Sequence, residues 1–380
     1  MINIAVDMLL GDKIKYLILI SAIAFSTLLI TQQTAIFWGV MRWTTTMLRN
    51  TNVPIWVVDS HVVQITDINP MKDTELARVR SISGVKWASP FYYNLLQAKV
   101  ANGNFTMVQL MGADSFTLLG IPPEIQEGQL ENLWKKDAVF LDKTGIKKLG
   151  VGLKNPLKVG DSFDLNDHEV RIAGIVNAEQ SFFGYPFVYT TFDRAVELAP
   201  SVRRNLSFIL VEAEPDVNYK ELAIKIQDET GLRAFTKDEF FWATIKWFFF
   251  NTGIPVSFGS TIVLGFFVGI AVTGQTFYSF IHENIGNLGA LKAMGADNSI
   301  LYRMLVVQAT IAGLIGYGIG IGMTAMLGLL TYYSEKIPFY LTWQIPLITL
   351  AMIIIICLFS VYLGFRKISQ IDPAEVFRGQ

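Results

Sequence analysis

Four long apolar stretches restrict the fold of this 380-residue chain more than any other feature of its sequence. A helix needs about 20 mostly apolar residues to cross the hydrocarbon core of a bilayer. Stretches of that length lie at residues 16–41, within 240–281, at 299–330 and at 345–366. The sequence therefore predicts a polytopic α-helical membrane protein with four transmembrane helices.

The composition agrees with a membrane protein and argues against a nucleic-acid partner. Hydrophobic residues make up 52% of the chain and charged residues only 17%, which is more apolar than an ordinary soluble domain. The net charge of -1 provides no basic field that would attract nucleic acid. Membrane lipids are the expected surroundings.

The distribution of lysine and arginine predicts how the spans are oriented. Cytoplasmic loops are enriched in these residues. Placing both termini in the cytoplasm puts most of the basic residues near the span ends on that side: Lys13, Lys15, Lys292, Arg303, Arg366, Lys367 and Arg378. The short loop at 331–344 then lies outside with only Lys336, and so does the large domain at 42–239.

The two ends of the chain are expected to lie on the cytoplasmic side in different ways. Apolar residues at helical spacing predict an amphipathic helix at 1–15 on the membrane surface, and a short extension without fixed structure is the alternative. Residues 367–380 form a cytoplasmic tail. The first span is too long for a signal-peptide core, so we expect it to be retained.

The domain at 42–239 alternates strand-like and helix-like segments, which predicts an α+β fold. The order of the segments suggests two lobes. Residues 113–190 form one lobe, which is inserted in the sequence of the other. "GDSFDLNDHE", residues 160–169, is expected to form a hairpin and not a calcium loop. "SFFGYPFVY", residues 181–189, is either core leading into a strand, which we favour, or an exposed aromatic loop that contacts a partner.

Residues 240–281 combine a dense aromatic run with the second span. The aromatic residues around Lys246 favour a helix at the membrane–water boundary, and a buried helix of the α+β domain is the alternative.

The segment at 282–298, between the second and third spans, is the main candidate for a partner-binding site. On a helix, Ile285, Leu288, Leu291 and Met294 form an apolar ridge beside the small residues Gly286 and Gly289. Such a helix can dock in a groove of another protein. Glu283 and Lys292 lie at its polar edge, and Gly295 suits a left-handed cap. The alternative is a tight turn stabilised only by the lipid surface.

Two groups of residues within the spans have simpler roles. Gly316 with Gly320, and Gly318 with Gly322, let helix backbones approach closely in lipid. Gln32 and Gln33 are polar positions of the first span that serve either interhelical hydrogen bonds or contact with a passing substrate.

No pattern in the sequence nominates an enzyme or a cofactor site. The chain has no Walker A motif, no G-x-S-x-G and no H-E-x-x-H. Its single cysteine, Cys357, lies in the fourth span, and its three histidines are scattered, so no cluster has metal-ligand spacing. We expect neither a catalytic residue nor a bound metal or cofactor.

Three motifs in this topological order resemble a known family. "ENIGNLGALKAMGA" at 283–296, "LKVGDSFDLNDHEVRIAGIV" at 157–176 and "ISQIDPAEVFRG" at 368–379 resemble segments of the permease subunits of the MacB/FtsX superfamily of ABC transporters, in particular DevC-like permeases. The resemblance covers nearly the whole chain.

The resemblance implies an export function and a set of partners. It implies a bacterial inner-membrane homodimer that binds a separate cytoplasmic ABC ATPase, which carries the ATP and Mg²⁺. It also implies a periplasmic domain, a periplasmic membrane-fusion adaptor and a TolC-like outer-membrane channel. The cargo would be a lipid, peptide, drug or similar molecule that is expelled or extracted. Alternatives within the superfamily are an FtsX-like signalling protein that regulates cell-wall hydrolases and a LolC/LolE-like lipoprotein-releasing subunit.

Overall fold

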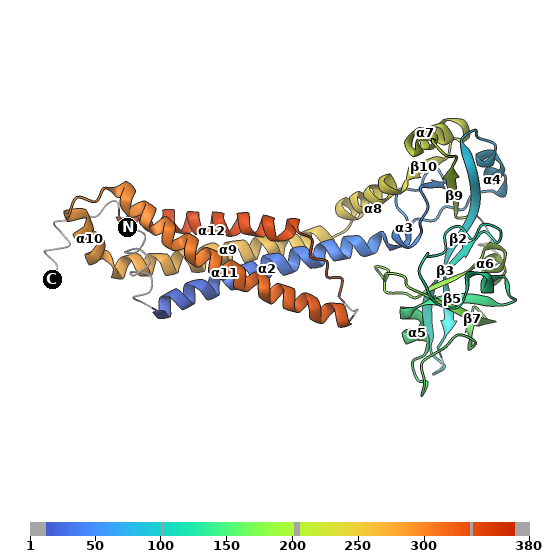
Figure 1. Ribbon diagram of the computed structural model, residues 1–380, viewed down its shortest axis with the longest axis horizontal. Helices are drawn as coiled ribbons and strands as arrows, with labels where there is room; N and C mark the ends of the chain where they lie inside the picture. Colours follow the sequence, from blue (N-terminus) through green and yellow to red (C-terminus); the bar gives the residue numbers. More distant parts are fainter. Residues whose placement is uncertain (1–12, 101, 201–205, 335–336, 369–380) are drawn as a thin grey trace. The chain divides into compact units, whose positions relative to one another are not determined.

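The computed structural model describes residues 13–100, 102–200, 206–334 and 337–368 (Figure 1). The chain divides into two compact units: an α/β domain, Met41–Thr252, and a membrane unit, Met1–Val40 with Gly253–Gln380. The helix expected at 1–15 lies almost wholly outside the described residues, and so do most of the tail at 367–380 and the motif at 368–379.

The described ranges contain four helices that are long and apolar enough to cross a membrane, which confirms the expected fold class. They are α2 (Lys13–Thr44), α9 (Ile254–Glu283), α11 (Asn298–Ser334) and α12 (Gln344–Ile368), and the short helix α10 (Ile285–Ala293) lies between α9 and α11.

The ends of these helices do not coincide with the ends of the apolar stretches. Helix α2 already includes Lys13, the first described residue and ahead of the expected start at residue 16, and α11 includes Ser334, within the loop expected at 331–344. Apolar composition marks the part of a helix that lies in lipid, whereas helical hydrogen bonding continues until a breaker stops it.

A shared apolar core holds the membrane unit together. It includes side chains from each spanning helix that are at most 2% exposed: Ile23, Phe277, Leu301 and Ile356. Large apolar residues on the outward faces, such as Phe267 and Leu329, are exposed, as lipid-facing residues should be.

The α/β domain is built on one ten-stranded sheet in the order β10-β1-β9-β2-β3-β8-β5-β7-β4, with β6 paired to β2 and β7. The strands are β1 (Ile55–Val58), β2 (Val85–Lys99), β3 (Phe105–Ala113), β4 (Ile125–Glu127), β5 (Ala138–Asp142), β6 (Ser162–Leu165), β7 (His168–Val176), β8 (Phe187–Thr191), β9 (Phe208–Ala213) and β10 (Arg233–Thr236). The helices are α3 (Thr46–Asn50), α4 (Asp73–Arg80), the 3-10 helix η1 (Leu130–Trp134), α5 (Lys143–Leu149), α6 (Phe192–Leu198), α7 (Tyr219–Thr230) and α8 (Lys237–Asn251).

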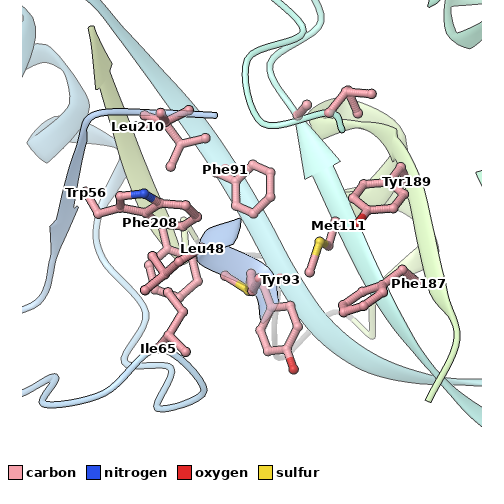
Figure 2. Packing of buried hydrophobic residues seen from close by; sticks show 14 of the residues in the cluster. Leu48, Trp56, Ile65, Phe91, Tyr93, Met111, Phe187, Tyr189, Phe208 and Leu210 are labelled. Carbon is pink, nitrogen blue, oxygen red and sulfur yellow. The ribbon is translucent and has the colours of Figure 1, made fainter. Parts of the chain in front are cut away.

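The strands of the two expected lobes are joined in this single sheet. Strand β2 pairs with β9 along its first part and with β3 along the rest, and β3 pairs in parallel with β8. One buried cluster extends along the join, from Trp56 and Phe208 past Phe91 to Phe187 and Tyr189 (Figure 2). Residues 113–190 therefore do not form a compact unit of their own.

Local sequence explains the expected hairpin. Strands β6 and β7 pair antiparallel around a two-residue turn, where Asn166 and Asp167 have φ angles of 51° and 63°. Asparagine and aspartate tolerate this left-handed conformation better than most residues, which suits a tight hairpin turn.

Candidate functional site

The connection between α9 and α11 is a short helix with defined ends. Asn284 closes α9, and its Nδ2 donates to the carbonyl of Phe280 at 2.9 Å. At the other end of α10, the N–H of Ala296 donates to the carbonyl of Leu291 at 3.0 Å, and Gly295 between them has a φ of 97°. The left-handed cap expected at Gly295 is therefore present.

The start of α11 is capped as well. The Oδ1 of Asp297 accepts a hydrogen bond from the backbone N–H of Ser299 at 2.7 Å. Side-chain capping satisfies a donor that the helix itself leaves unpaired. The connection is therefore fixed at both ends of α10, and its side chains are presented in defined positions.

The apolar ridge expected on this helix is split between two faces. Leu288 is only 2% exposed and belongs to the core of the membrane unit, and Leu291 packs partly against that core. Met294, by contrast, is 76% exposed. Because the chain's own spans cover one face of α10, Leu288 contacts the core of the membrane unit, and its expected role in binding another protein is wrong.

The accessible face of α10 is defined by one arc of the helix. Ile285, Ala290 and Lys292 are half-buried and Gly289 is buried. Small or polar residues occupy the exposed positions, except for the methionine at the end of the helix. Together with half-buried Ala290, we call these residues the coupling face: Gly286, Asn287, Ala290, Ala293 and Met294.

The polar edge of the connection is tied to the first span. Glu283, the last residue of α9, forms an ion pair with Lys15 in the first turns of α2. The pair is partly exposed and contributes modestly to stability. Its structural consequence is that the start of α2 is held to the end of α9.

The glycines of α11 lie on two sides of the helix, one packed against α2 and one open. A Cβ atom on Gly316 would lie 2.8 Å from the Cβ of Ile23, and one on Gly320 would lie 2.5 Å from the Cβ of Thr27, so both face α2 at close range. A Cβ atom on Gly318 or Gly322 would meet no described heavy atom within 4 Å. Only the first pair packs against the described part of this chain.

The polar residues of α2 differ in how deeply they are buried. Thr31 is buried, and its Oγ1 donates to the Oγ1 of Thr349 in α12 at 3.2 Å. Gln32 and Gln33 are half-buried neighbours on the same helix. Thr31 thus makes an interhelical hydrogen bond in this region, and the role expected of Gln32 and Gln33 stays a prediction.

A second arrangement, not found by the sequence analysis, lies at the end of α2 in the α/β domain. Glu179, in the loop between β7 and β8, forms ion pairs with Arg42, at 2.7 Å, and with Arg49. Asn50 holds the same loop through two bonds with the backbone of Glu179, at 3.0 and 3.2 Å. Burial by itself raises the pKa of Glu179, but hydrogen bonds from the two arginines outweigh it and lower the pKa. We call this set the Glu179 clamp.

A fully buried carboxyl group, that of Asp142, caps α5. Its Oδ1 accepts from the N–H groups of Gly145, at 2.7 Å, and Phe187, at 3.2 Å. Burial raises the pKa of Asp142 to about 7 in spite of these bonds. An aspartate in this position is a structural cap and not a surface charge.

The described residues contain no group of three or more His, Cys, Asp and Glu side chains arranged to hold a metal ion. An open cleft of about 930 Å³ lies between the starts of α7 and α8, and charged residues of both signs line it, among them Glu212, Lys220 and Lys237. Because the lining carries both charges, it does not indicate which class of ligand the cleft would bind.

The fold and the connection together define a multi-pass membrane protein with a large α/β domain between its first two spans. The family model described as a MacB-like periplasmic core domain matches residues 16–229, and the model described as the FtsX-like permease C-terminal matches residues 259–373. The first match covers more than half of the chain. The protein therefore belongs to the MacB/FtsX type of ABC transporter permease.

Two sequence relatives and one solved structure are similar to parts of this chain. An uncharacterised ABC transporter permease of Mycobacterium tuberculosis is 22% identical over 317 residues, which cover 82% of this chain and 80% of the relative. A putative hemin transport system permease protein, HrtB, of Staphylococcus haemolyticus is 23% identical over 228 residues, 59% of this chain and 61% of that protein. The periplasmic region of MacB from Actinobacillus actinomycetemcomitans is 19% identical, with a TM-score of 0.37, over 54% of this chain and 96% of that structure. Membership of this family implies a cytoplasmic ATPase partner.

Proposed function

We propose that this chain is the non-catalytic membrane subunit of an ATP-driven export system, and that a separate ATPase binds the coupling face of α10. The observation that carries the proposal is the exposure of Met294 at 76%, beside small residues on a helix that is capped at its C-terminal end. Small residues allow close backbone approach, and an exposed methionine adapts to an apolar groove.

The proposal includes the partners of the chain. ATP and Mg²⁺ bind to the ATPase and not to this chain. A second copy of the permease completes the transmembrane part, and a periplasmic adaptor with a TolC-like outer-membrane channel carries the cargo onward. In the bacterial inner membrane, both termini face the cytoplasm and the α/β domain faces the periplasm. The cargo is a lipid, peptide, drug or similar molecule.

Contacts within each unit suggest how motion is passed on. Movement of α10 acts on α9, and the ion pair of Glu283 with Lys15 passes it to the first turns of α2. Helix α2 is continuous from Lys13 to Thr44, so it carries the movement to Arg42 in its last turn. At that point the Glu179 clamp links the helix to the loop between β7 and β8. A helix is stiff enough to transmit such a displacement along its length.

The experiment that tests the proposal is co-purification of the ATPase with full-length Met294→Asp. A charge placed in an apolar protein–protein contact is strongly unfavourable, so we expect retention of the ATPase to fall at least tenfold, equivalent to about 1.4 kcal/mol of binding free energy. Membrane insertion should be unchanged, because Met294 lies on the exposed side.

Two matched variants complete the test. Met294→Leu keeps an apolar side chain and should retain the ATPase. Phe116→Asp introduces the same charge at a residue of the α/β domain that is 79% exposed, and it should also retain the ATPase. Normal retention by Met294→Asp would exclude the coupling face as the binding site.

A further inference from the structure

Helix α8 presents aromatic side chains on two opposite faces. The inner face belongs to the core of the α/β domain: Phe240 is 0% exposed and stacks on Phe235 at 4.7 Å, and Phe248 is also buried. The outer face consists of Trp242, Lys246, Phe249 and Phe250, at positions i, i+4, i+7 and i+8. The core therefore fixes the helix, and the side chains of this outer stripe are exposed.

Polarity also changes along the length of α8. The first turn holds Asp238 and Glu239, and Glu239 forms a capping box with Thr236. The last turn holds Phe249, 45% exposed, and Phe250, 72% exposed. One end of the helix therefore suits water and the other suits an apolar or interfacial environment.

The loop between β7 and β8 places further aromatic residues beside the last turns of α8. Phe182 contacts Phe248 with ring centroids 5.8 Å apart. Its neighbour Phe183 is 57% exposed and stacks on Tyr185 at 5.9 Å. The core position favoured for this segment is confirmed for Ser181 and for Phe187–Tyr189, which are buried, whereas Phe183 is exposed.

The loop is held in place by hydrogen bonds. The Nε2 of Gln109 donates to the Oγ of Ser181 at 2.7 Å and to the carbonyl of Tyr185 at 3.0 Å. Phe183 is thus fixed in its exposed position between two anchored residues. The exposed residues Phe183, Phe249 and Phe250, with half-buried Tyr185, come from this loop and from the last turn of α8, and we call them the aromatic rim.

The connectivity of the chain limits how far the last turn of α8 can lie from the second span. Helix α8 ends at Asn251, and the membrane-spanning helix α9 begins at Ile254. Three peptide units reach at most about 11 Å, so the last turn of α8 lies close to the point where the chain enters the bilayer. Aromatic residues are enriched at this boundary, and Lys246 on the same stripe suits lipid phosphates.

We propose that the aromatic rim docks the α/β domain on the lipid surface, in the leaflet that faces this domain. The sequence suggested an interfacial role for α8, and the structure adds the loop of Phe183, which is distant in sequence. The rings lie at the boundary between headgroups and acyl chains. This role does not depend on ATPase binding, and it brings the domain into direct contact with lipid.

Lipid-borne quenchers can test the proposal in the full-length chain. The background carries Cys357→Ser, because Cys357 is the chain's own cysteine. A bimane label is attached at Phe183→Cys, Phe250→Cys or Phe116→Cys, and the protein is reconstituted in vesicles of phosphatidylethanolamine and phosphatidylglycerol. Some lipids carry a nitroxide near the top of the acyl chain. Phe116 is the matched control, because it is an exposed aromatic residue of the same domain that contacts Trp87 and not the rim.

We expect labels at positions 183 and 250 to be quenched several-fold more strongly than the label at 116. Quenching at position 183 that equals the control would overturn the proposal, even if position 250 is quenched, because the loop would then not reach the lipid. A signal at 183 that depends on protein density and not on the quencher lipid would also overturn it, in favour of contact between two copies of the chain.

Discussion

The α/β domain and the membrane unit complete their cores in different ways. In the α/β domain the largest side chains are enclosed by the domain itself, with Trp56, Phe140 and Phe208 at 0% exposure. In the membrane unit, Phe267 is 60% exposed and Met294 76% exposed. The core of the domain is thus closed within the chain, although its aromatic rim is exposed, whereas the membrane unit requires lipid and, in our proposal, partner proteins. Substitutions in the core of the domain should change stability, and those on the outer faces of the membrane unit should change assembly.

The largest effect that we predict concerns the buried carboxyl of Asp142. Its pKa is about 7 in the folded chain, against an ordinary value of 3.8. Between pH 3.8 and about pH 7, the folded state therefore holds a proton that the unfolded state has lost. Its contribution to stability is complete below about pH 4 and is lost as the pH rises to about 7. This difference between the two pKa values corresponds to about 4 kcal/mol of unfolding free energy.

The variant Asp142→Asn should remove this pH dependence. The amide keeps the oxygen that caps α5 and replaces the ionisable one, so the variant should be more stable than the parent at pH 8. Denaturant unfolding of the α/β domain's tryptophan signal in the full-length protein, at pH 5 and pH 8, measures the difference. Equal pH profiles for parent and variant would show that this core tolerates the charge.

Helix packing in the membrane unit should respond to one glycine register and not to the other. A Cβ atom on Gly320 would lie 2.6 Å from the carbonyl oxygen of Ala24, so Gly320→Ala should destabilise the unit by about 1–3 kcal/mol. Gly318→Ala, on the open side, should be neutral. Unfolding in mixed detergent micelles compares the two. A loss for Gly318→Ala of similar size would show that a second copy covers that face.

The smallest effect should come from the Glu179 clamp. Because Glu179 is partly exposed, Glu179→Gln should cost only about 1 kcal/mol, and the cost should shrink in high salt. Glu197→Gln is the control, since Glu197 forms an exposed pair with Arg194 one helical turn away and should cost almost nothing. Thermal unfolding of the two variants at low and high salt separates these outcomes. A salt-independent loss would mean that packing, not charge, holds the loop.

Much of the fold was accessible from the sequence, because local patterns determine it. The length of each apolar run is sufficient to predict a span, and alternating residues at 162–176 predict the β6–β7 hairpin. Gly295 was predictable as a cap, because the conformation that a helix end requires there suits glycine.

The rest depends on contacts between distant segments. Leu288 and Met294 are similar apolar residues on one short helix, and only the packing of the neighbouring spans buries the first and exposes the second. The Glu179 clamp joins residues more than 100 positions apart, and no local periodicity records such a pairing. The joining of both expected lobes in one sheet likewise follows from the long-range pairing of β3 with β8.

Site-specific crosslinking tests most directly the claim that an ATPase contacts the exposed face of α10. In the Cys357→Ser background, a benzophenone maleimide is attached at Met294→Cys or at Leu288→Cys, and the full complex is irradiated in native membranes. Our account predicts a crosslink to the ATPase from position 294 and none from position 288. An ATPase crosslink from position 288, with none from position 294, would contradict it.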